Sequence, residues 1–182
     1  MKGEFMKPEY FVLTAVGTDR VGIVEELAEI LEEQSCNIEE SRMAVLGREF
    51  AVILLASGSP EAVEKLTSGA EELRARIGLR AEIRPTAAPG ELPAGRPYSI
   101  EAVSLDAPGI MHAVTAVLKE AGVNIEEIST DTTSAPWTGA TMFHMEGIIV
   151  LPPGVHPSDL REKLAALELE RDIDIRLEPL KR

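Results

Sequence analysis

Basic residues are scarce in this chain of 182 residues, which has 18 Lys and Arg against 31 Asp and Glu and a net charge of −13. A hidden basic half is excluded as well, because residues 1–84 carry −6 and residues 98–182 carry −7. A nucleic-acid reader needs a basic stripe that displaces counterions from phosphates. Docking on anionic lipid also needs basic residues. The charge therefore argues against direct nucleic-acid contact and against membrane docking.

Cysteine and long apolar runs are scarce too. Cys36 is the single cysteine, which excludes an internal disulfide and a zinc site built from several thiolates. No apolar run approaches the roughly 20 residues that span a bilayer. The apolar stretch from Tyr10 to Val16 is too short for a signal sequence and is soon followed by Asp19. We expect a soluble, cytoplasmic protein.

Signatures of catalysis are missing as well. The three histidines, His112, His144 and His156, form no zinc-protease motif, and the sequence has neither a nucleophile elbow nor a glycine-rich phosphate loop. We interpret these histidines as satisfied or solvated side chains. The sequence therefore predicts no enzymatic activity, no cofactor and no bound metal.

What the chain does contain is a long internal repeat. A shift of 87 residues places residues 11–40 over residues 98–127 without a gap, and 11 of these 30 positions are identical. A repeat of this length indicates two copies of one supersecondary unit. Four prolines in residues 85–97 favour a stiff, extended linker between the copies. We predict one domain at 1–84, a proline-rich linker at 85–97 and a second domain at 98–182.

Each copy has the pattern strand, helix, strand, strand, helix, strand. In the first copy the patterns predict strands at 10–16, 37–45, 49–57 and 79–84 and helices at about 20–34 and 60–77. Val24, Leu27 and Leu31 are expected on the apolar face of the first helix. In the second copy they predict strands at 98–105, 124–132, 141–151 and 172–178 and helices at 108–121 and 157–169.

This order is typical of an α+β protein with ferredoxin-like βαββαβ domains, each a four-stranded antiparallel sheet with two helices on one face. The run from Phe50 to Ala56 is apolar on both alternating sets, although a strand with one solvated face should alternate. We expect the second face of this sheet, or an edge, to be buried by the other copy or by another chain. The alternative is a central strand with a few exposed aliphatic side chains.

The two copies agree best at Asp-x-x-Gly-Ile before the first helix and at Asn-Ile where the second strand begins. Backbone N–H groups at a helix start can hold a carboxylate, and glycine permits close approach. Asp19 or Asp106 can face an ammonium group, while the amide of Asn37 or Asn124 can donate and accept. The pattern predicts an α-amino acid ligand. Because the first helix is long, a site that uses both motifs would lie between copies.

A purely structural role explains the same residues. Aspartate is a favoured N-cap of its own helix, and asparagine after a helix is a common turn residue. Recurrence at the same offset favours inheritance of the two motifs as a unit, but inheritance can preserve the fold alone. Both interpretations stay open on the sequence.

Two segments of the first copy, residues 15–24 (AVGTDRVGIV) and 36–50 (CNIEESRMAVLGREF), resemble the ACT domain family and, within it, the glycine cleavage system transcriptional repressors. Residues 103–110 (VSLDAPGI) with 122–125 (GVNI) resemble a second ACT domain. ACT domains are small regulatory modules, usually paired, that bind amino acids at domain interfaces through the first strand–helix loop and the start of the second strand. The resemblance implies an amino-acid site made of Asp19, Arg20, Val21, Gly22, Ile23, Asn37, Ile38, Asp106, Ala107, Pro108, Gly109, Ile110, Asn124 and Ile125.

The resemblance also implies an amino-acid-sensing regulator, with glycine or serine as the favoured ligand. Such a protein would act through a protein partner, for example a transcription factor, and not by direct DNA contact, and it would form a homodimer or larger homo-oligomer. Two alternatives stay open. One is a free-standing regulatory subunit of an amino-acid metabolic enzyme, and the other is an ACT assembly module that binds no ligand.

Two features depart from the family pattern. Val21 stands where ACT loops usually have proline, whereas Pro108 keeps the proline in the second copy. The loop from Thr133 to Gly139 is longer than a minimal ACT hairpin and carries Trp137, the only tryptophan. We expect Trp137 to cap a core or an interface rather than to close over a ligand.

Overall fold

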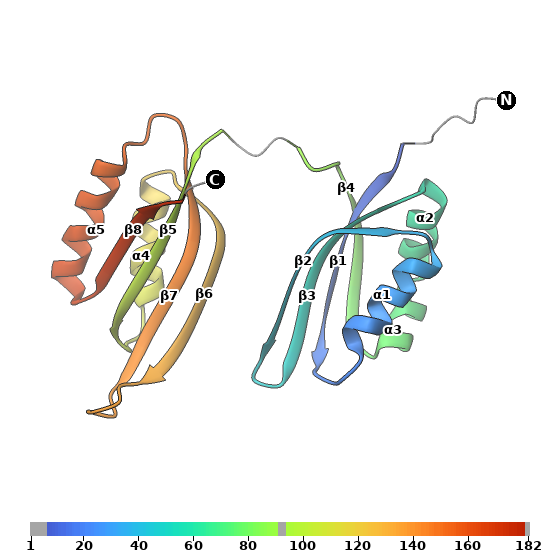
Figure 1. Cartoon of the computed structure of the whole chain (residues 1–182), viewed down its shortest axis with the longest axis horizontal. Helices are drawn as coiled ribbons and strands as arrows, with labels where there is room; N and C mark the ends of the chain where they lie inside the picture. Colours follow the sequence, from blue (N-terminus) through green and yellow to red (C-terminus); the bar gives the residue numbers. More distant parts are fainter. Residues whose placement is uncertain (1–6, 91–93, 181–182) are drawn as a thin grey trace. The chain divides into compact units, whose positions relative to one another are not determined.

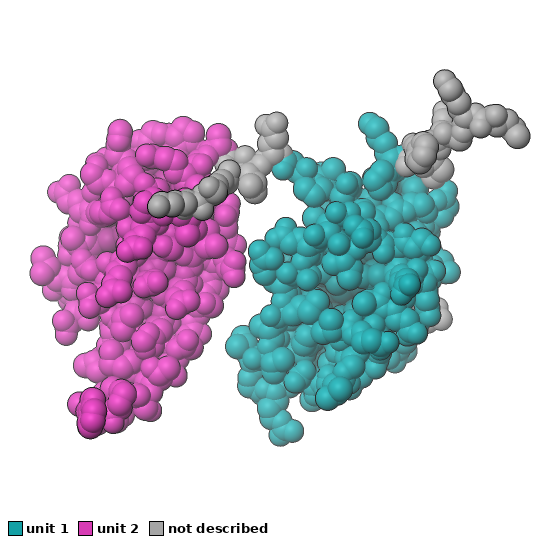
Figure 2. Space-filling view, viewed as in Figure 1, with its two compact units in different colours: residues 1–91 teal, residues 92–182 magenta. Residues whose placement is uncertain are grey.

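The computed structural model describes residues 7–90 and 94–180. The chain forms two compact units, residues 1–91 and 92–182, which have different colours in Figure 2. Each unit is described by itself below. None of the helices in the described residues is long and apolar enough to cross a membrane.

The first unit is a four-stranded antiparallel sheet with its helices on one face (Figure 1). Its elements follow in the order β1 (Glu9–Thr18), α1 (Ile23–Glu33), β2 (Asn37–Leu46), β3 (Glu49–Gly58), α2 (Pro60–Ser68), α3 (Ala70–Ile77) and β4 (Arg80–Thr86). The strand order is β2-β3-β1-β4. Gly47, at a positive φ of 58°, forms the tight turn between β2 and β3.

The second unit repeats this arrangement with the strand order β6-β7-β5-β8. Its elements are β5 (Arg96–Leu105), α4 (Ile110–Glu120), β6 (Asn124–Ser134), β7 (Thr141–Leu151), α5 (Pro157–Arg171) and β8 (Asp174–Pro179). The α+β class and the βαββαβ order that the sequence predicts are confirmed in both units.

The core of each unit lies between the sheet and the helices. In the first unit, side chains from alternate positions of β1 and β3 pack against one face of α1, and the buried set includes Phe11, Leu13, Ile23, Leu27, Leu31, Val52 and Leu54. Val24 was predicted on this apolar face but is 47% exposed. It lies at the margin of the helix stripe, which is centred on Ile23 and Leu27.

The single helix predicted at 60–77 is wrong, because the chain forms α2 and α3 with a break at Gly69. The hydroxyls of Thr67 and Ser68 donate to the carbonyls of Val63 and Glu64, and Gly69 N–H bonds to the Lys65 carbonyl. Such side-chain bonds to the preceding turn bend helices, and glycine is a poor interior helix residue. The corresponding α5 runs through 15 residues without a break.

The second face of the first sheet is open within its own unit. Phe50, Val52 and Leu54 of β3 are buried beneath the helices, whereas Ile53 on the other face is 52% exposed. The expectation that another copy or chain covers this face stays a prediction.

The strands β2 and β6 each form one edge of their sheets, and nearly all of their residues are exposed. Each contains a β-bulge at an equivalent place, between Ile38 and Glu40 in β2 and between Ile125 and Glu127 in β6. A bulge adds one residue to one strand and redirects the neighbouring side chains. These bulges directly follow the Asn-Ile motif of each copy.

Candidate functional site

The two loops before α1 and α4 each end in a glycine with the same left-handed conformation. Gly22 adopts φ 96° and Gly109 adopts φ 93°, and each is the N-cap of its helix without a side-chain cap hydrogen bond. The positive φ is a conformation that glycine adopts without strain. The possibility that Asp19 or Asp106 caps its own helix is therefore wrong for this structure.

The two aspartates are held by their backbones. Asp19 N–H donates to the Arg48 carbonyl at 2.9 Å, and Asp106 N–H donates to the Thr141 carbonyl at 2.9 Å. Both loops are thus tied to the adjacent hairpin, and both aspartate side chains lie in exposed residues. Each loop therefore leads into a helix whose first-turn N–H groups are not capped by a side chain.

The two helix starts differ in charge. The first turn of α1 contains Glu25 and Glu26, whereas the first turn of α4 contains no acidic residue. Negative side chains near the positive end of a helix compete with a bound carboxylate. The second copy therefore offers the better place for a carboxylate group.

Arg20 of the first loop is already engaged. Its guanidinium donates to Glu26 Oε1 at 2.6 Å and to the Ile77 carbonyl at 3.0 Å. The hydrogen bond with Glu26 raises the pKa of Arg20 and lowers the pKa of the Glu26 carboxyl. The second copy has Ala107 at the matching position, so this local ion pair belongs to the first loop.

The remaining loop residues divide between core and solvent. The side chains of Ile23 and Ile110 are buried, so only their backbones line the loops. Val21 is fully exposed, and Ala107 and Pro108 are exposed as well.

The second motif of the first copy forms a small polar cluster at the start of β2. Ser57 Oγ donates to Glu39 Oε1 at 2.6 Å, and Asn37 Nδ2 donates to the same oxygen at 3.1 Å. These bonds, that of Ser57 first, lower the pKa of Glu39. Asn37 is the first residue of the strand and not a turn residue. Ile38 beside it is 39% exposed, and Asn124 and Ile125 begin β6 in the same way.

Within one unit the two motifs lie at opposite ends of the sheet. Thr18, next to the first loop, pairs with Glu49 at the start of β3, whereas Asn37 pairs with Ser57 near its end. Eight residues along β3 correspond to roughly 26 Å. The structure of a single unit therefore does not bring the two motifs together. A site that joins them stays a prediction.

The polar cluster gives a prediction on pH. Because its folded-state pKa is lowered, Glu39 contributes stability above the ordinary glutamate pKa and loses this contribution as the pH falls through the folded value. Replacing Ser57 by alanine removes the shorter hydrogen bond and should raise the pKa of Glu39, as an NMR titration of its carboxyl carbon would measure. Glu61, whose pKa is lowered by its own backbone N–H and by Ser59, is the internal control. An unchanged Glu39 pKa would contradict the role of Ser57.

Trp137 does not cap the core of its unit, because it is 97% exposed. The loop between β6 and β7 closes on itself through the bond from Ala135 N–H to the Ala140 carbonyl and the bond from Gly139 N–H to the Ala135 carbonyl. These bonds close the loop at the end of the hairpin formed by β6 and β7. An interface role for Trp137 stays a prediction.

The described residues contain no group of three His, Cys, Asp or Glu side chains that could hold a metal ion. They do contain a cavity between α1 and the α2–α3 pair, which none of the predicted site residues lines. Its only sequence signal is Gly69 within an otherwise helical pattern.

Comparison with known proteins gives a consistent result. Models of the ACT domain match residues 9–84 and residues 98–155. The glycine cleavage system transcriptional repressor of Escherichia coli is 30% identical over 158 residues, which cover 87% of this chain and 83% of that protein.

Two solved structures resemble the whole chain. A protein of unknown function from Galdieria sulphuraria has a TM-score of 0.81 and 33% identity, covering 96% of this chain and 100% of that one. A putative glycine cleavage system transcriptional repressor has a TM-score of 0.70 and 26% identity, covering 96% and 99%.

Proposed function

Because the chain belongs to the ACT domain family, we propose that it senses a small amino acid and regulates transcription through a protein partner. Its relationship to a repressor makes it a regulatory protein and not an enzyme. The observation that carries the sensing proposal is the recurrence, in both copies, of an uncapped helix start behind a positive-φ glycine together with a bulged Asn-Ile strand start.

The proposed ligand is glycine or serine. Its carboxylate would accept hydrogen bonds from the N–H groups at the helix start, and its ammonium group would face the aspartate of the loop. An asparagine amide at the strand start can donate to the carboxylate and accept from the ammonium group. The residues proposed to bind are the loop residues 19–23 and 106–110 and the strand residues 37–38 and 124–125.

Between the two copies, the second is proposed to bind more tightly. Its helix start has no competing glutamate, and Pro108 restricts the backbone of its loop. In the first copy the Asn37 amide already donates to Glu39. A ligand that binds Asn37 would have to break or share that bond.

Calorimetric titration of the full chain with the twenty amino acids tests this proposal. Replacing Asn124 by alanine should weaken glycine or serine binding by about 10- to 100-fold, because a hydrogen bond to a charged group is lost. Asn37→Ala is the matched control, since Asn37 is the other asparagine of the chain and occupies the equivalent position. Its effect should be smaller.

Three outcomes would count against the proposal. Absence of heat with every amino acid would contradict sensing, and a larger effect of Asn37→Ala would contradict the assignment to the second copy.

The net charge of −13 supports action through a partner that supplies the basic DNA-contacting surface. Specific binding of DNA by this chain alone would contradict that part. The proposed place of action is the cytoplasm.

A further inference from the structure

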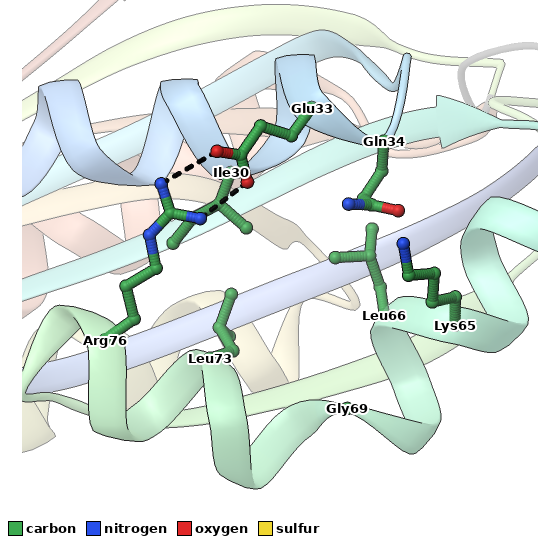
Figure 3. Close-up of a pocket in the computed structure, with 8 residues that line it drawn as sticks. All are labelled: Ile30, Glu33, Gln34, Lys65, Leu66, Gly69, Leu73 and Arg76. Carbon is green, nitrogen blue, oxygen red and sulfur yellow. Dashed lines mark hydrogen bonds and ion pairs between the residues drawn. The ribbon is translucent and has the colours of Figure 1, made fainter.

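A cavity of about 290 Å³ lies on the helix side of the first unit, and none of the loop and strand-start residues discussed above lines it. It is lined from α1 and from the α2–α3 pair (Figure 3), by Ile30, Glu33, Gln34, Lys65, Leu66, Gly69, Leu73 and Arg76. Small-molecule sites begin at about 300 Å³. The cavity lies at the lower end of this range, which suits a ligand of only a few heavy atoms.

The helix break at Gly69 belongs to this cavity. Gly69 ends α2, begins α3 and lines the cavity between Leu66 and Leu73. The floor is made by Ile30, Leu66 and Leu73, which are 5%, 7% and 5% exposed. These three side chains form an aliphatic surface that a ligand's hydrocarbon part could cover.

The charged groups of the cavity are arranged unequally. Figure 3 shows the Arg76 guanidinium bound to the Glu33 carboxylate at one end, and the Lys65 ammonium and the Gln34 carboxamide at the other. Arg76 also donates to Glu29, so its single positive charge is shared by two carboxylates. Among the described residues Lys65 forms no ion pair at contact distance, so its three N–H donors are not bound by a carboxylate. Its charge does act on Glu33 from a distance and, after the larger effect of Arg76, helps to lower the pKa of that carboxyl.

From this arrangement we infer that the cavity binds a small aliphatic monocarboxylate. Its branched hydrocarbon tail lies on Ile30, Leu66 and Leu73, and its carboxylate is bound by the Lys65 ammonium and by the Gln34 amide N–H. The other end of the cavity is bounded by Arg76 and Glu33, which bind each other and so require no charged group of the ligand. This site is separate from the proposed amino-acid site and does not depend on it.

Titration of the full chain with 4-methylpentanoate, followed by methyl NMR of labelled isoleucine and leucine, tests the inference. The methyl signals of Ile30, Leu66 and Leu73 should shift together and saturate. Acetate should bind at least about tenfold more weakly, because it lacks most of the buried hydrocarbon. The neutral amide of the same acid should also bind at least about tenfold more weakly, because it cannot pair with Lys65.

A matched pair of variants tests the lysine. Lys65→Met keeps the aliphatic part of an exposed side chain and removes its charge, and it should reduce the affinity for 4-methylpentanoate at least about fivefold. Lys119→Met is the control, because Lys119 also lies in the last turn of a helix, α4, of the second unit. The circular dichroism spectra of both variants should match that of the unchanged chain.

The inference is overturned if the three methyl groups do not shift, if the neutral amide binds as well as the acid, or if Lys119→Met weakens binding as much as Lys65→Met. Glycine added to the same sample should leave these methyl signals in place. This outcome keeps the test independent of the amino-acid site, whose failure would appear only in the calorimetric titration.

Discussion

Replacing Phe11 by alanine should lower the free energy of unfolding of the first domain by about 3–5 kcal/mol. Phe11 is fully buried near the start of β1, the strand that lies between β3 and β4, and it belongs to the cluster that joins the sheet to α1. The truncation removes the buried ring and leaves a cavity that the surrounding strands fill only in part. Urea denaturation followed by the NMR amide signals of β1 and β3 measures the change.

Val21→Ala is the control for this experiment, because Val21 is fully exposed in the loop before α1. Its effect should stay within about 0.5 kcal/mol. A loss below 1 kcal/mol for Phe11→Ala would mean that the core of the first domain is not organised around this ring.

Replacing Gly147 by alanine should destabilise the second domain by about 1–3 kcal/mol. If the proposed amino-acid site lies there, the same replacement should also weaken amino-acid binding. A Cβ on Gly147 would lie 2.7 Å from the backbone oxygen of Glu127, at the bulge of β6. That oxygen belongs to the backbone, so β6 must move away from β7. Asn124 and Ile125 precede the bulge directly, and the same movement shifts them.

Gly90→Ala is the matched control, because a Cβ at Gly90 meets no atom within 4 Å. Thermal unfolding and the calorimetric titration should be carried out on both variants. An unchanged unfolding temperature for Gly147→Ala would show that β6 can move away from β7 without a loss of stability. If the stability falls but the affinity for amino acids does not change, the bulge is not part of the proposed site.

The element order could be predicted from the sequence because several independent signals agree. The repeat at 87 residues fixes two equivalent units, and Pro60, Gly78 and Pro157 mark helix ends that the structure reproduces. The helical pattern of apolar residues, however, continues through Gly69. A glycine inside a helix lowers its stability by only about 1 kcal/mol relative to alanine, so Gly69 alone does not predict a break. The structure explains the break by the hydrogen bonds from the Thr67 and Ser68 hydroxyls to carbonyls of the preceding turn, which the sequence does not reveal.

The residues of the candidate site stay a prediction, and their local geometry could not be predicted from the sequence. Aspartate is a good N-cap, yet β1 continues to Thr18 and the Asp19 N–H is bound to the Arg48 carbonyl. The helix therefore starts later, with glycine at its N-cap. The bulges after Ile38 and Ile125 depend on how each strand pairs with its neighbour. This register cannot be predicted from the sequence of one strand alone.

The exposed strands β2 and β6 have a consequence for self-association. An uncovered edge strand offers unpaired backbone groups with which another chain can pair, and long edges of this kind promote aggregation. Here each edge is interrupted by a bulge and carries acidic side chains, among them Glu39 and Glu40 in β2 and Glu126, Glu127 and Asp131 in β6. The excess of carboxylates therefore disfavours pairing between two such edges. The bulges protect the same two edges by their geometry, independently of charge.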